Sequence, residues 1–446
     1  MSQRDSFASK FGVLVAMAGS AIGLGNLWRF PYLVGTNGGA AFIIIYLAIV
    51  FLLALPIMYS EFLIGRRAQS NVFGAFKKLA PGSHWNVIGI LSIICCVLVL
   101  SFYSVVGGWT LDYLVKSLAF KFTSESAQLD GLFEQTITSS VRPLIFMFLF
   151  VALSGTILLS GVKEGIEKYS KVLMPLLFVM VVFIAVRSVM LPGAMAGLEF
   201  LFKPDFSKVT STTFLDALGQ AFLSLSVGFG IIFTYASYVK REVNIVSMSQ
   251  QTAIADTVFA IIAGVAIMPA VFSFGISPGQ GPGLVFVTLP YIFSQIPLGG
   301  ILAILFFFVL FIAAITSAIS LLEVIVAYIV EEFHIQRRNG IFWAVGIVLF
   351  LGIFCSLSQG LLAEVKLFGN NIFDLFDKFS SNILMPLGAL LIVLYVGWGM
   401  KRADFTDEIT SGGKHGFSKW FLNYVYWSIK YLAPLVIGVI MIRSLL

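Results

Sequence analysis

The stretch AMAGSAIGLGNLWRFP, residues 16–31, decides the fold of this 446-residue chain. It lies in a long apolar run, yet it holds three glycines within seven residues, followed by Asn26 and Arg29. A glycine costs roughly 1 kcal/mol in a helix interior, and backbone groups freed in hydrocarbon must find partners in protein, water or ligand. The stretch therefore predicts a membrane helix that is broken at residues 19–26.

The break predicts a binding site, because unwinding frees backbone groups at membrane depth. Freed carbonyls bind a cation and freed amides bind an anionic group. The alternative is a close contact between two helices, since small residues let membrane helices approach each other. Asn26 and Arg29 favour the binding site, because a packing contact needs neither an amide side chain nor a charge.

The composition of the chain places it in a bilayer. It is 59% hydrophobic, 15% aromatic and 11% charged, whereas soluble domains carry about 25% charged residues. The net charge of +6 does not indicate a nucleic-acid partner, because the Lys and Arg residues are scattered between apolar runs. The three cysteines, Cys95, Cys96 and Cys355, lie in apolar segments without ligand spacing, so neither disulfides nor a metal site is predicted.

Apolar runs recur along the whole chain, and a helix needs about 20 apolar residues to cross a bilayer. The predicted segments are residues 11–33, 39–64, 86–116, 143–161, 167–191, 213–238, 247–275, 299–330, 340–358, 378–400 and 417–442. The predicted fold class is therefore all-α integral membrane, with eleven transmembrane helices in one transporter domain over residues 1–446. The Lys and Arg distribution predicts a cytoplasmic N-terminus and an outside C-terminus in the cell inner (plasma) membrane.

A second interruption lies in the sixth segment. The sequence LSLSVGFGII, residues 223–232, again combines paired glycines with hydroxyl residues midway along an apolar run. Interruptions in segments one and six match transporters built from repeated halves, whose binding site lies between the halves near the membrane midplane.

The connection at residues 277–298 carries no charge, although it is predicted to lie outside the membrane. It holds Pro278, Pro282 and Pro290 among several large apolar side chains. An exposed linker would be polar, so we expect this connection to fold back into the protein as a lid. The alternative is an ordinary hydrophobic loop at the membrane surface.

The residues around these breaks resemble the neurotransmitter:sodium symporter family. The matching motifs are GSAIGLGNLWRFPYLVGTNGGAAF at 19–42, YSEFLIGR at 59–66, LSFYSVVGGWTLDY at 100–113, GQAFLSLSVGFGIIFTYASYV at 219–239 and AAITSAISLLE at 313–323. The resemblance implies a leucine-transporter-type fold of two inverted five-helix repeats, with helices one and six broken. Residues 11–191 would form the first repeat, residues 213–400 the second, and residues 417–442 one additional helix.

The resemblance also implies two sites for sodium, a hard cation that prefers oxygen ligands. The first site would take oxygen atoms of Ala21, Asn26, Ser224 and Asp256 together with the substrate carboxylate. The second would take the carbonyls of Gly19, Ile22 and Ala313 and the hydroxyls of Thr316 and Ser317. For Thr316 and Ser317 the alternative is that each hydroxyl bonds back to its own helix.

A zwitterionic substrate suits the same break. The amides near Leu24 and Gly25, the positive end of a half-helix and the Tyr103 hydroxyl would face its carboxylate. The full substrate set implied by the resemblance is Ala21, Gly23, Leu24, Gly25, Val99, Tyr103, Leu223, Ser226, Phe229, Ser317 and Leu321. Because this lining is largely apolar, the predicted substrate is an α-amino acid with an apolar or aromatic side chain.

Charged pairs at the two ends of the site are implied to act as gates. Arg29 would pair with Asp377 to close the outer side, with Asp374 as the rival partner one helical turn away. Arg4 would pair with Glu331 near Tyr238 to close the cytoplasmic side. Such pairs contribute little to stability, but a gate needs only a modest and reversible bias.

The chain departs from chloride-dependent members of the family. Those members have a small polar residue at the position that aligns with Ala260, where chloride supplies a negative charge near the first sodium. Here Asp256 stands at a position that is more often asparagine, so the chain carries its own carboxylate. We therefore predict chloride independence.

The predicted function is sodium-coupled import of an amino acid by alternating access, with an amino acid exchanger or a proton-coupled transporter as the alternative. The predicted partners are the amino acid, sodium ions and membrane lipid. A channel would need a continuous polar lining, whereas the polar groups here cluster at mid-depth. An enzyme is not predicted, because the three histidines, His84, His334 and His415, fall in loops.

Overall fold

Helices dominate the computed structural model, which describes residues 6–123, 129, 131–276 and 284–445. Within those residues, nine helices are long and apolar enough to cross a membrane. The nine are Ala40–Ala68, His84–Leu118, Arg142–Leu159, Val162–Val189, Ile245–Ser273, Gly299–Phe333, Arg337–Leu357, Ile372–Gly399 and Lys419–Ile442. Their main elements are α4 (Leu55–Ala68), α6 (Val87–Leu118), α8 (Arg142–Leu159), α9 (Lys168–Val189), α13 (Ile245–Ser273), α15 (Gly299–Phe333), α16 (Arg337–Leu357), α18 (Met385–Leu394) and α20 (Lys419–Trp427).

The first segment is broken, as the glycine-rich stretch predicts. Helix α1 (Lys10–Ala21) ends before the break, and η1 (Gly25–Arg29) and α2 (Phe30–Thr36) continue after it at an angle of 50°. Counting this bent pair as one span brings the total in the described residues to ten.

The sixth segment is broken over a longer stretch. Helix α11 (Ser211–Ser224) and helix α12 (Ile231–Ala236) are separated by turns in which Ser226, Gly228 and Gly230 have positive φ angles of 56°, 95° and 83°. Left-handed backbone is unfavourable for most residues and easy for glycine, so the paired glycines explain where the helix stops. Neither half is long enough to count as a span, so the prediction of eleven spans stays a prediction.

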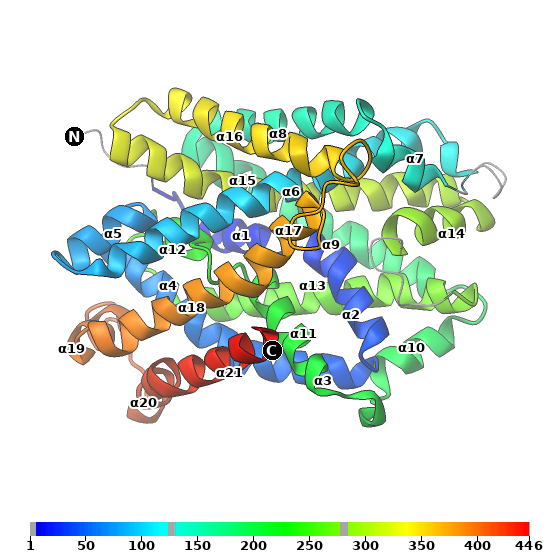
Figure 1. The fold of residues 1–446 in the computed structure, drawn as a ribbon. Coiled ribbons are helices and arrows are strands. Elements are labelled where there is room, and N and C mark those ends of the chain that lie inside the picture. Colours follow the sequence, from blue (N-terminus) through cyan, green and yellow to red (C-terminus); the bar gives the residue numbers. More distant parts are fainter. Residues whose placement is uncertain (1–5, 124–128, 130, 277–283, 446) are drawn as a thin grey trace.

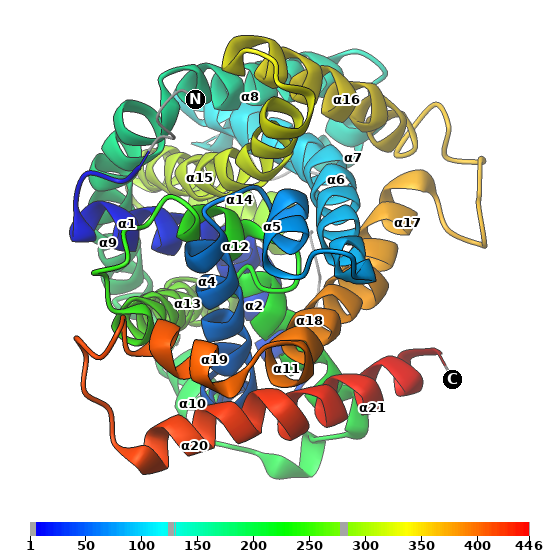
Figure 2. The ribbon, with the colours of Figure 1, turned by 90° about the vertical axis from the view of Figure 1, so that its left-hand side faces the viewer.

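The interrupted helices lie inside the bundle. Figure 2 shows α2, α4 and α12 near the centre, with α8 and α16 at one edge and α20 and α21 (Ala433–Leu445) at the opposite edge. Figure 1 shows that most of the long helices run in roughly the same direction, so their ends gather at two sides of the molecule. The unwound backbone is therefore surrounded by protein, as a membrane requires.

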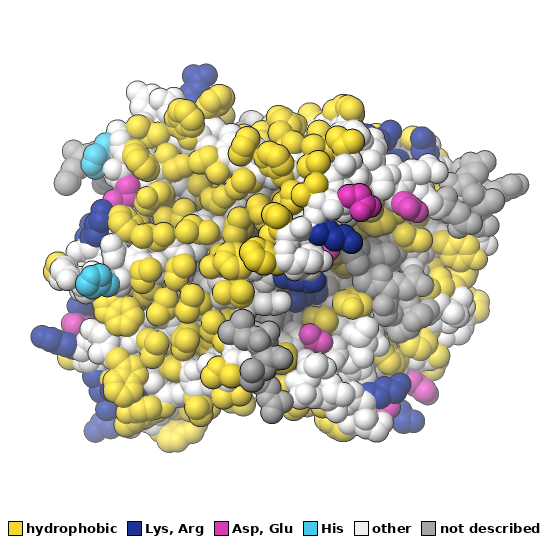
Figure 3. Space-filling model, viewed as in Figure 1, with side chains coloured by type: hydrophobic (Ala, Val, Ile, Leu, Met, Phe, Trp, Pro, Cys, Tyr) yellow, Lys and Arg dark blue, Asp and Glu magenta, His cyan; other side chains and the backbone are white. Residues whose placement is uncertain are grey.

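The outer surface suits a lipid environment. Figure 3 shows hydrophobic side chains covering the middle of one face, with most charged side chains toward its two ends. Large apolar side chains such as Phe342 on α16, which is 75% exposed, point outward. In water such a surface would cause the protein to aggregate, whereas lipid acyl chains solvate it.

The described part of the uncharged connection folds back into the protein, as predicted. It forms η8 (Leu284–Thr288) and α14 (Leu289–Gln295), and Phe286 and Ile292 are buried. The ring of Phe286 stacks on Phe133 at 5.3 Å and meets the edge of Trp109 at 6.1 Å. Residues 277–283 lie outside the described residues.

Candidate ion and substrate site

The first break is capped by a side chain from within it. Helix α1 ends at Ala21, and Ile22 is extended, with φ −77° and ψ 94°. The freed amide of Gly23 then donates a hydrogen bond to Asn26 Oδ1 at 3.1 Å. Asn26 thus supports the break locally, in addition to the ion-binding role that the sequence predicts.

Asn26, Ser224 and Asp256 form one buried polar cluster. Asn26 Nδ2 donates to Asp256 Oδ1 at 2.8 Å and to Ser224 Oγ at 3.1 Å. Ser224 Oγ lies 2.9 and 2.8 Å from the two carboxylate oxygens of Asp256, and the Tyr46 hydroxyl lies 3.3 Å from Oδ2. Each of these side chains is almost fully buried. The structure therefore brings together three of the four residues predicted for the first sodium site.

The donor set of this cluster suits a singly charged hard cation. It offers one carboxylate and a hydroxyl oxygen, together with the Asn26 amide oxygen, which here accepts from the amide of Gly23. Hard cations prefer such oxygen ligands. No group of three or more His, Cys, Asp or Glu side chains suited to a metal ion occurs in the part of the chain that the structure describes. One carboxylate among neutral oxygens balances one positive charge, which fits sodium better than a divalent ion.

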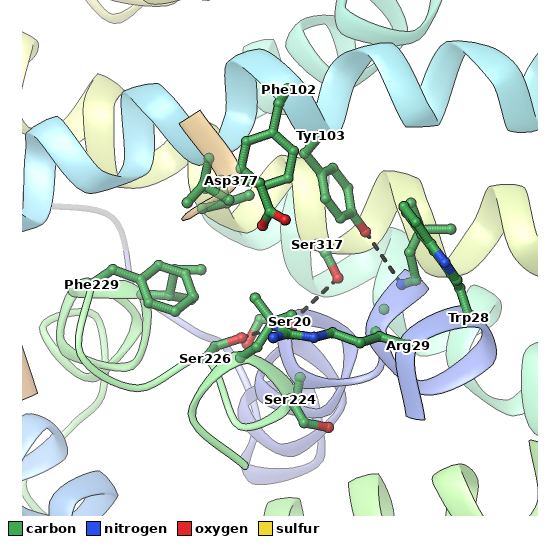
Figure 4. Close-up of a pocket in the computed structure, with 18 of the residues that line it drawn as sticks. Ser20, Trp28, Arg29, Phe102, Tyr103, Ser224, Ser226, Phe229, Ser317 and Asp377 are labelled. Carbon is green, nitrogen blue, oxygen red and sulfur yellow. Dashed lines mark hydrogen bonds between the residues drawn. The ribbon is translucent and has the colours of Figure 1, made fainter. Parts of the chain in front are cut away.

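The two broken helices meet at the carbonyl of Ser20. Ser226 Oγ donates to this oxygen at 2.9 Å, and Ser317 Oγ of α15 donates to it at 3.3 Å (Figure 4). Ser226 reaches it from the second break, where its own backbone has a positive φ angle. Carbonyl and hydroxyl oxygens from three helices therefore converge beside the cavity.

Gly23 and Leu24 lie against the wall formed by Tyr103 and Ser317. The amide of Leu24 donates to the Tyr103 hydroxyl at 3.4 Å (Figure 4). A Cβ atom added at Gly23 would lie only 2.6 Å from Ser317 Oγ and 3.3 Å from the Tyr103 hydroxyl. Gly23 is therefore needed for close packing, because a side chain there would collide with Ser317.

The second predicted sodium site is partly assembled. A Cβ atom added at Gly19 would lie 3.5 Å from Thr316 Cβ, so the first break and α15 are in contact there. Thr316 Oγ1 donates to the carbonyls of Ile312 and Ala313 at 2.9 and 3.2 Å. This is the bond back to the same helix that the alternative interpretation describes, whereas Ser317 reaches across to the first segment. The role of Gly19, Ile22, Ala313, Thr316 and Ser317 in binding sodium stays a prediction.

A cavity of about 310 Å³ lies between the two breaks. All eleven predicted substrate residues line it: Ala21, Gly23, Leu24, Gly25, Val99, Tyr103, Leu223, Ser226, Phe229, Ser317 and Leu321. Small-molecule sites usually measure about 300 to 1,000 Å³, so this cavity suits a single small molecule. Its walls are largely apolar.

Sequence reasoning missed several lining residues. They are Ser20, Trp28, Tyr32, Phe102, Ile231 and Phe373. It also missed Gln220, whose Nε2 donates to the carbonyl of Gly25 at 3.2 Å, and Tyr46 beside Asp256. Phe102 and Gln220 lie within the matched motifs, close in sequence to predicted site residues, and this proximity was a signal that could have identified them. Phe373 lies in the first turn of α17 (Ile372–Phe379), after a long irregular connection, and no local pattern indicates that it reaches the cavity.

The predicted outer gate is not closed in this structure. Arg29, Asp374 and Asp377 all line the cavity, but no ion pair joins Arg29 to any of the described residues. Figure 4 shows Arg29 and Asp377 directed into the cavity from different sides. Tyr103 and Phe229 also lie on different sides of it. The choice between Asp374 and Asp377 as the partner of Arg29 therefore stays open.

The opposite end of the site is packed. The Tyr238 hydroxyl donates to Glu323 at 2.7 Å, and Glu323 also forms a salt bridge of 2.6 Å with Arg337. The ring of Phe7 meets the edge of Tyr238 at 6.4 Å. Glu331 accepts a hydrogen bond of 2.7 Å from the amide of Asn71. Arg4, the predicted partner of Glu331, lies outside the described residues.

Three comparisons with known proteins agree with one another. The family model described as "Sodium:neurotransmitter symporter family" matches residues 4–130 and 134–446. The sodium-dependent transporter YhdH of Bacillus subtilis is 42% identical over 98% of this chain and 97% of its own length. A sodium-dependent transporter of Haemophilus influenzae is 36% identical over 99% and 98%. The crystal structure of MhsT in complex with L-phenylalanine is 44% identical, with a TM-score of 0.93 over 99% of this chain and 100% of MhsT.

Proposed function

Because the chain belongs to the sodium:neurotransmitter symporter family, we propose that it imports an apolar or aromatic α-amino acid together with sodium ions. Family membership makes the chain a sodium-dependent membrane transporter with the leucine-transporter fold, and its relatives are transporters rather than enzymes. The observation that carries the proposal is the apolar cavity between two broken helices, directly beside the buried Asn26–Asp256 cluster.

The substrate proposal rests on how polar atoms are distributed in the cavity. Amides of Leu24 and Gly25 and the Tyr103 hydroxyl lie at one side and suit a carboxylate. Val99, Phe229 and Leu321 provide apolar walls for a side chain. MhsT, whose crystal structure holds L-phenylalanine, has nearly the same fold. An aromatic amino acid such as phenylalanine is therefore the first substrate to test.

We propose two sodium sites with the predicted ligands. The first uses Ala21, Asn26, Ser224, Asp256 and the substrate carboxylate, and the second uses Gly19, Ile22, Ala313, Thr316 and Ser317. Because the substrate is itself a ligand of the first ion, ion and substrate each raise the affinity for the other. Alternating closure of an outer gate at Arg29 and an inner gate at Arg4, Glu331 and Tyr238 would then move both across the membrane.

We propose that transport does not depend on chloride. Asp256 places a negative charge within hydrogen-bond distance of Asn26 and Ser224, where an anion would otherwise be needed to balance sodium. The residue aligned with the chloride ligand of other members is Ala260, which is buried and has no polar side chain. The same carboxylate supports the alternative of proton coupling, because it would gain a proton when the sodium leaves.

Membrane orientation and internal symmetry complete the proposal. The N-terminus would lie in the cytoplasm and the C-terminus outside, in the plasma membrane. Residues 11–191 and 213–400 would form the two inverted repeats, with residues 417–442 as the added helix. The pairing of a break in segment one with a break in segment six supports this division.

Uptake into vesicles tests the proposal. Purified protein is placed in liposomes, and accumulation of labelled phenylalanine is measured under an inward sodium gradient, an inward proton gradient, or neither. We expect accumulation with sodium alone, unchanged when gluconate replaces chloride. Accumulation driven by protons without sodium would support the alternative, and exchange without net accumulation would support the exchanger.

A further inference from the structure

Lys430 is a charged residue within an apolar helix. It lies in η11 (Ser428–Leu432), inside the candidate span Lys419–Ile442. Ionisable side chains within a membrane span are unfavourable and usually mark a function or a partner. Among the described residues, no carboxylate lies close enough to Lys430 to form an ion pair.

Aromatic rings take the place of a carboxylate around this ammonium group. Lys430 Nζ lies 4.5 Å from the centre of the Trp398 ring, 5.6 Å from Tyr426 and 5.8 Å from Tyr431. Ring faces attract a cation but leave its net charge uncompensated. An anion that binds beside Lys430 would therefore compensate the charge of its ammonium group.

The backbone holds Lys430 in this position. Trp398 Nε1 donates to the carbonyl of Lys430 at 3.0 Å. A Cβ atom added at Gly397 would lie 2.8 Å from Lys430 Cα, so the glycine lets the two helices touch at this point. The two segments in contact, η10 (Tyr395–Gly399) and η11, are both π-helical. Single turns of π-helix are often found at functional sites. The backbone of Lys430 is thus fixed by the contact between the two helices, and this sets the position from which its side chain extends.

A second cation lies on the same aromatic cluster. The guanidinium carbon of Arg402 is 5.0 Å from the centre of the Tyr426 ring, which Lys430 also contacts. The side chain of Arg402 is exposed and hydrogen-bonds to Asn423. Two positive charges therefore share one ring, and neither has a carboxylate partner among the described residues.

The cluster faces outward near one end of the bundle. Figure 2 shows α20 and α21 at the outer edge, and Figure 1 places α19 (Arg402–Ile409) and α20 at the same end as α5 (Val72–Leu79). Trp398, Trp427 and Tyr431 are 59%, 50% and 45% exposed. Exposed Trp and Tyr side chains gather at headgroup depth in membrane proteins.

We propose that Lys430 and Arg402, with Trp398, Tyr426 and Tyr431, bind the phosphate of an anionic phospholipid headgroup. The two cations complement a singly charged phosphodiester, and the exposed rings lie against the first carbons of its acyl chains. Basic clusters between membrane helices are suited to such headgroups. A free phosphate would gain nothing from the rings, so we assign the site to lipid. This site is separate from the transport cavity and does not depend on the proposed substrate.

Native mass spectrometry of the full chain in detergent tests the proposal. The protein is titrated with phosphatidylglycerol or phosphatidylcholine, and the number of retained lipids is counted. We expect the wild type to retain phosphatidylglycerol in preference to phosphatidylcholine. Lys430→Gln and Arg402→Gln should each weaken retention about fivefold, the effect of one headgroup contact, whereas Lys430→Arg should keep it. Inorganic phosphate should not displace the lipid.

Lys401→Gln is the matched control, because it removes one exposed cation next to Arg402 that makes no ring contact. Equal loss of lipid in Lys401→Gln would show a diffuse charge effect and overturn the proposal. Unchanged retention by Lys430→Gln, or equal retention of phosphatidylcholine by the wild type, would also overturn it. If Lys430→Gln does not give a monodisperse protein, Arg402→Gln decides the outcome, since this exposed side chain can be changed without disturbing the helix contact.

Discussion

Of the two described side chains that hydrogen-bond to Asn26, Ser224 and Asp256, only Asp256 carries a negative charge. Asn26 turns its nitrogen toward Asp256 and its oxygen toward the amide of Gly23. An amide oxygen has two lone pairs, so Asn26 can keep the bond to Gly23 and still face a cation. The carboxylate then balances the charge of the ion.

Replacing Asp256 by asparagine keeps the size of the side chain and removes the charge. We expect the apparent sodium affinity in a phenylalanine-binding assay to fall at least about tenfold, corresponding to about 1.4 kcal/mol. Added chloride should restore part of the loss, because an anion can replace the missing charge. Asp205→Asn, in an exposed loop, is the control and should bind sodium like the wild type. Unchanged sodium affinity in Asp256→Asn would contradict the assignment.

Gly23 is the most crowded glycine of the first break. Because an added methyl group would lie 2.6 Å from Ser317 Oγ, we expect Gly23→Ala to push α15 and the break apart and to reduce substrate affinity about a hundredfold or more. The measurement is phenylalanine binding at saturating sodium. Gly346→Ala, on α16 with nothing within 4 Å, is the control and should bind normally. Normal binding by Gly23→Ala would mean that the cavity wall tolerates a shift there.

At the scale of single elements, the start of α1 is attached to the fifth segment. Glu167 of η6 (Val162–Glu167) accepts hydrogen bonds from the amide of Ala8 at 2.6 Å and from Ser9 Oγ at 2.7 Å. Ser9 in turn caps the helix by accepting from the amide of Gly12 at 2.9 Å. The carboxylate would collide with any Cβ atom at Gly12, so the glycine is what lets it approach. The half-helix that ends at the ion site is therefore held at its other end by the fifth segment.

Glu167→Gln should loosen this attachment. The neutral amide interacts less favourably with a helix N-terminus and with Lys171, so we expect a local loss of roughly 1 to 2 kcal/mol. Hydrogen–deuterium exchange of residues 8–14 should then be about five- to thirtyfold faster, with other segments unchanged. Glu164→Gln on the same turn is the control, because Glu164 is exposed and pairs only at 3.8 Å or more. Equal exchange rates in the two variants would refute the attachment.

At the scale of the whole molecule, the two ends of the cavity differ. On one side Phe7, Tyr238, Glu323 and Arg337 pack together, whereas on the other side Arg29 forms no ion pair with any described residue. In a transporter that alternates between two states, the packed end of the cavity must open when the other end closes. Ligands that contact both broken helices can shift the balance only by the difference in their affinity for the two states.

Sodium and substrate should therefore bind cooperatively. We expect phenylalanine affinity, measured by isothermal titration, to be about 5 to 150 times higher in sodium than in potassium, the usual range for a coupling of about 1 to 3 kcal/mol. Thermal stabilisation by the two ligands together should exceed the sum of their separate effects. Potassium is the control cation, because it has the same charge and a larger radius. Additive stabilisation would contradict the proposal that the substrate carboxylate is a ligand of the first sodium ion.

Local patterns were enough to predict the breaks, whereas most of the residues that line the cavity were predicted from the family resemblance. The glycines between residues 19 and 26 and the paired glycines at 228 and 230 disfavour a continuous helix. The structure interrupts the helices there at residues 22–24 and 225–230. Phe373 and the contact of Gly397 with Lys430 were not predictable, because each depends on how distant helices meet. The bond of Thr316 back to its own helix was one of two alternatives that the sequence left open.

The sequence by itself determined that the chain crosses a membrane, where its first and sixth segments break, and which residues border the breaks. These follow from composition and from the backbone preferences of glycine, which act over a few residues. Only the tertiary structure decided that Asn26, Ser224, Tyr46 and Asp256 share one hydrogen-bonded cluster and that Arg29 forms no ion pair with any described residue. Distances between side chains far apart in the sequence depend on the packing of whole helices, and no local pattern encodes that packing.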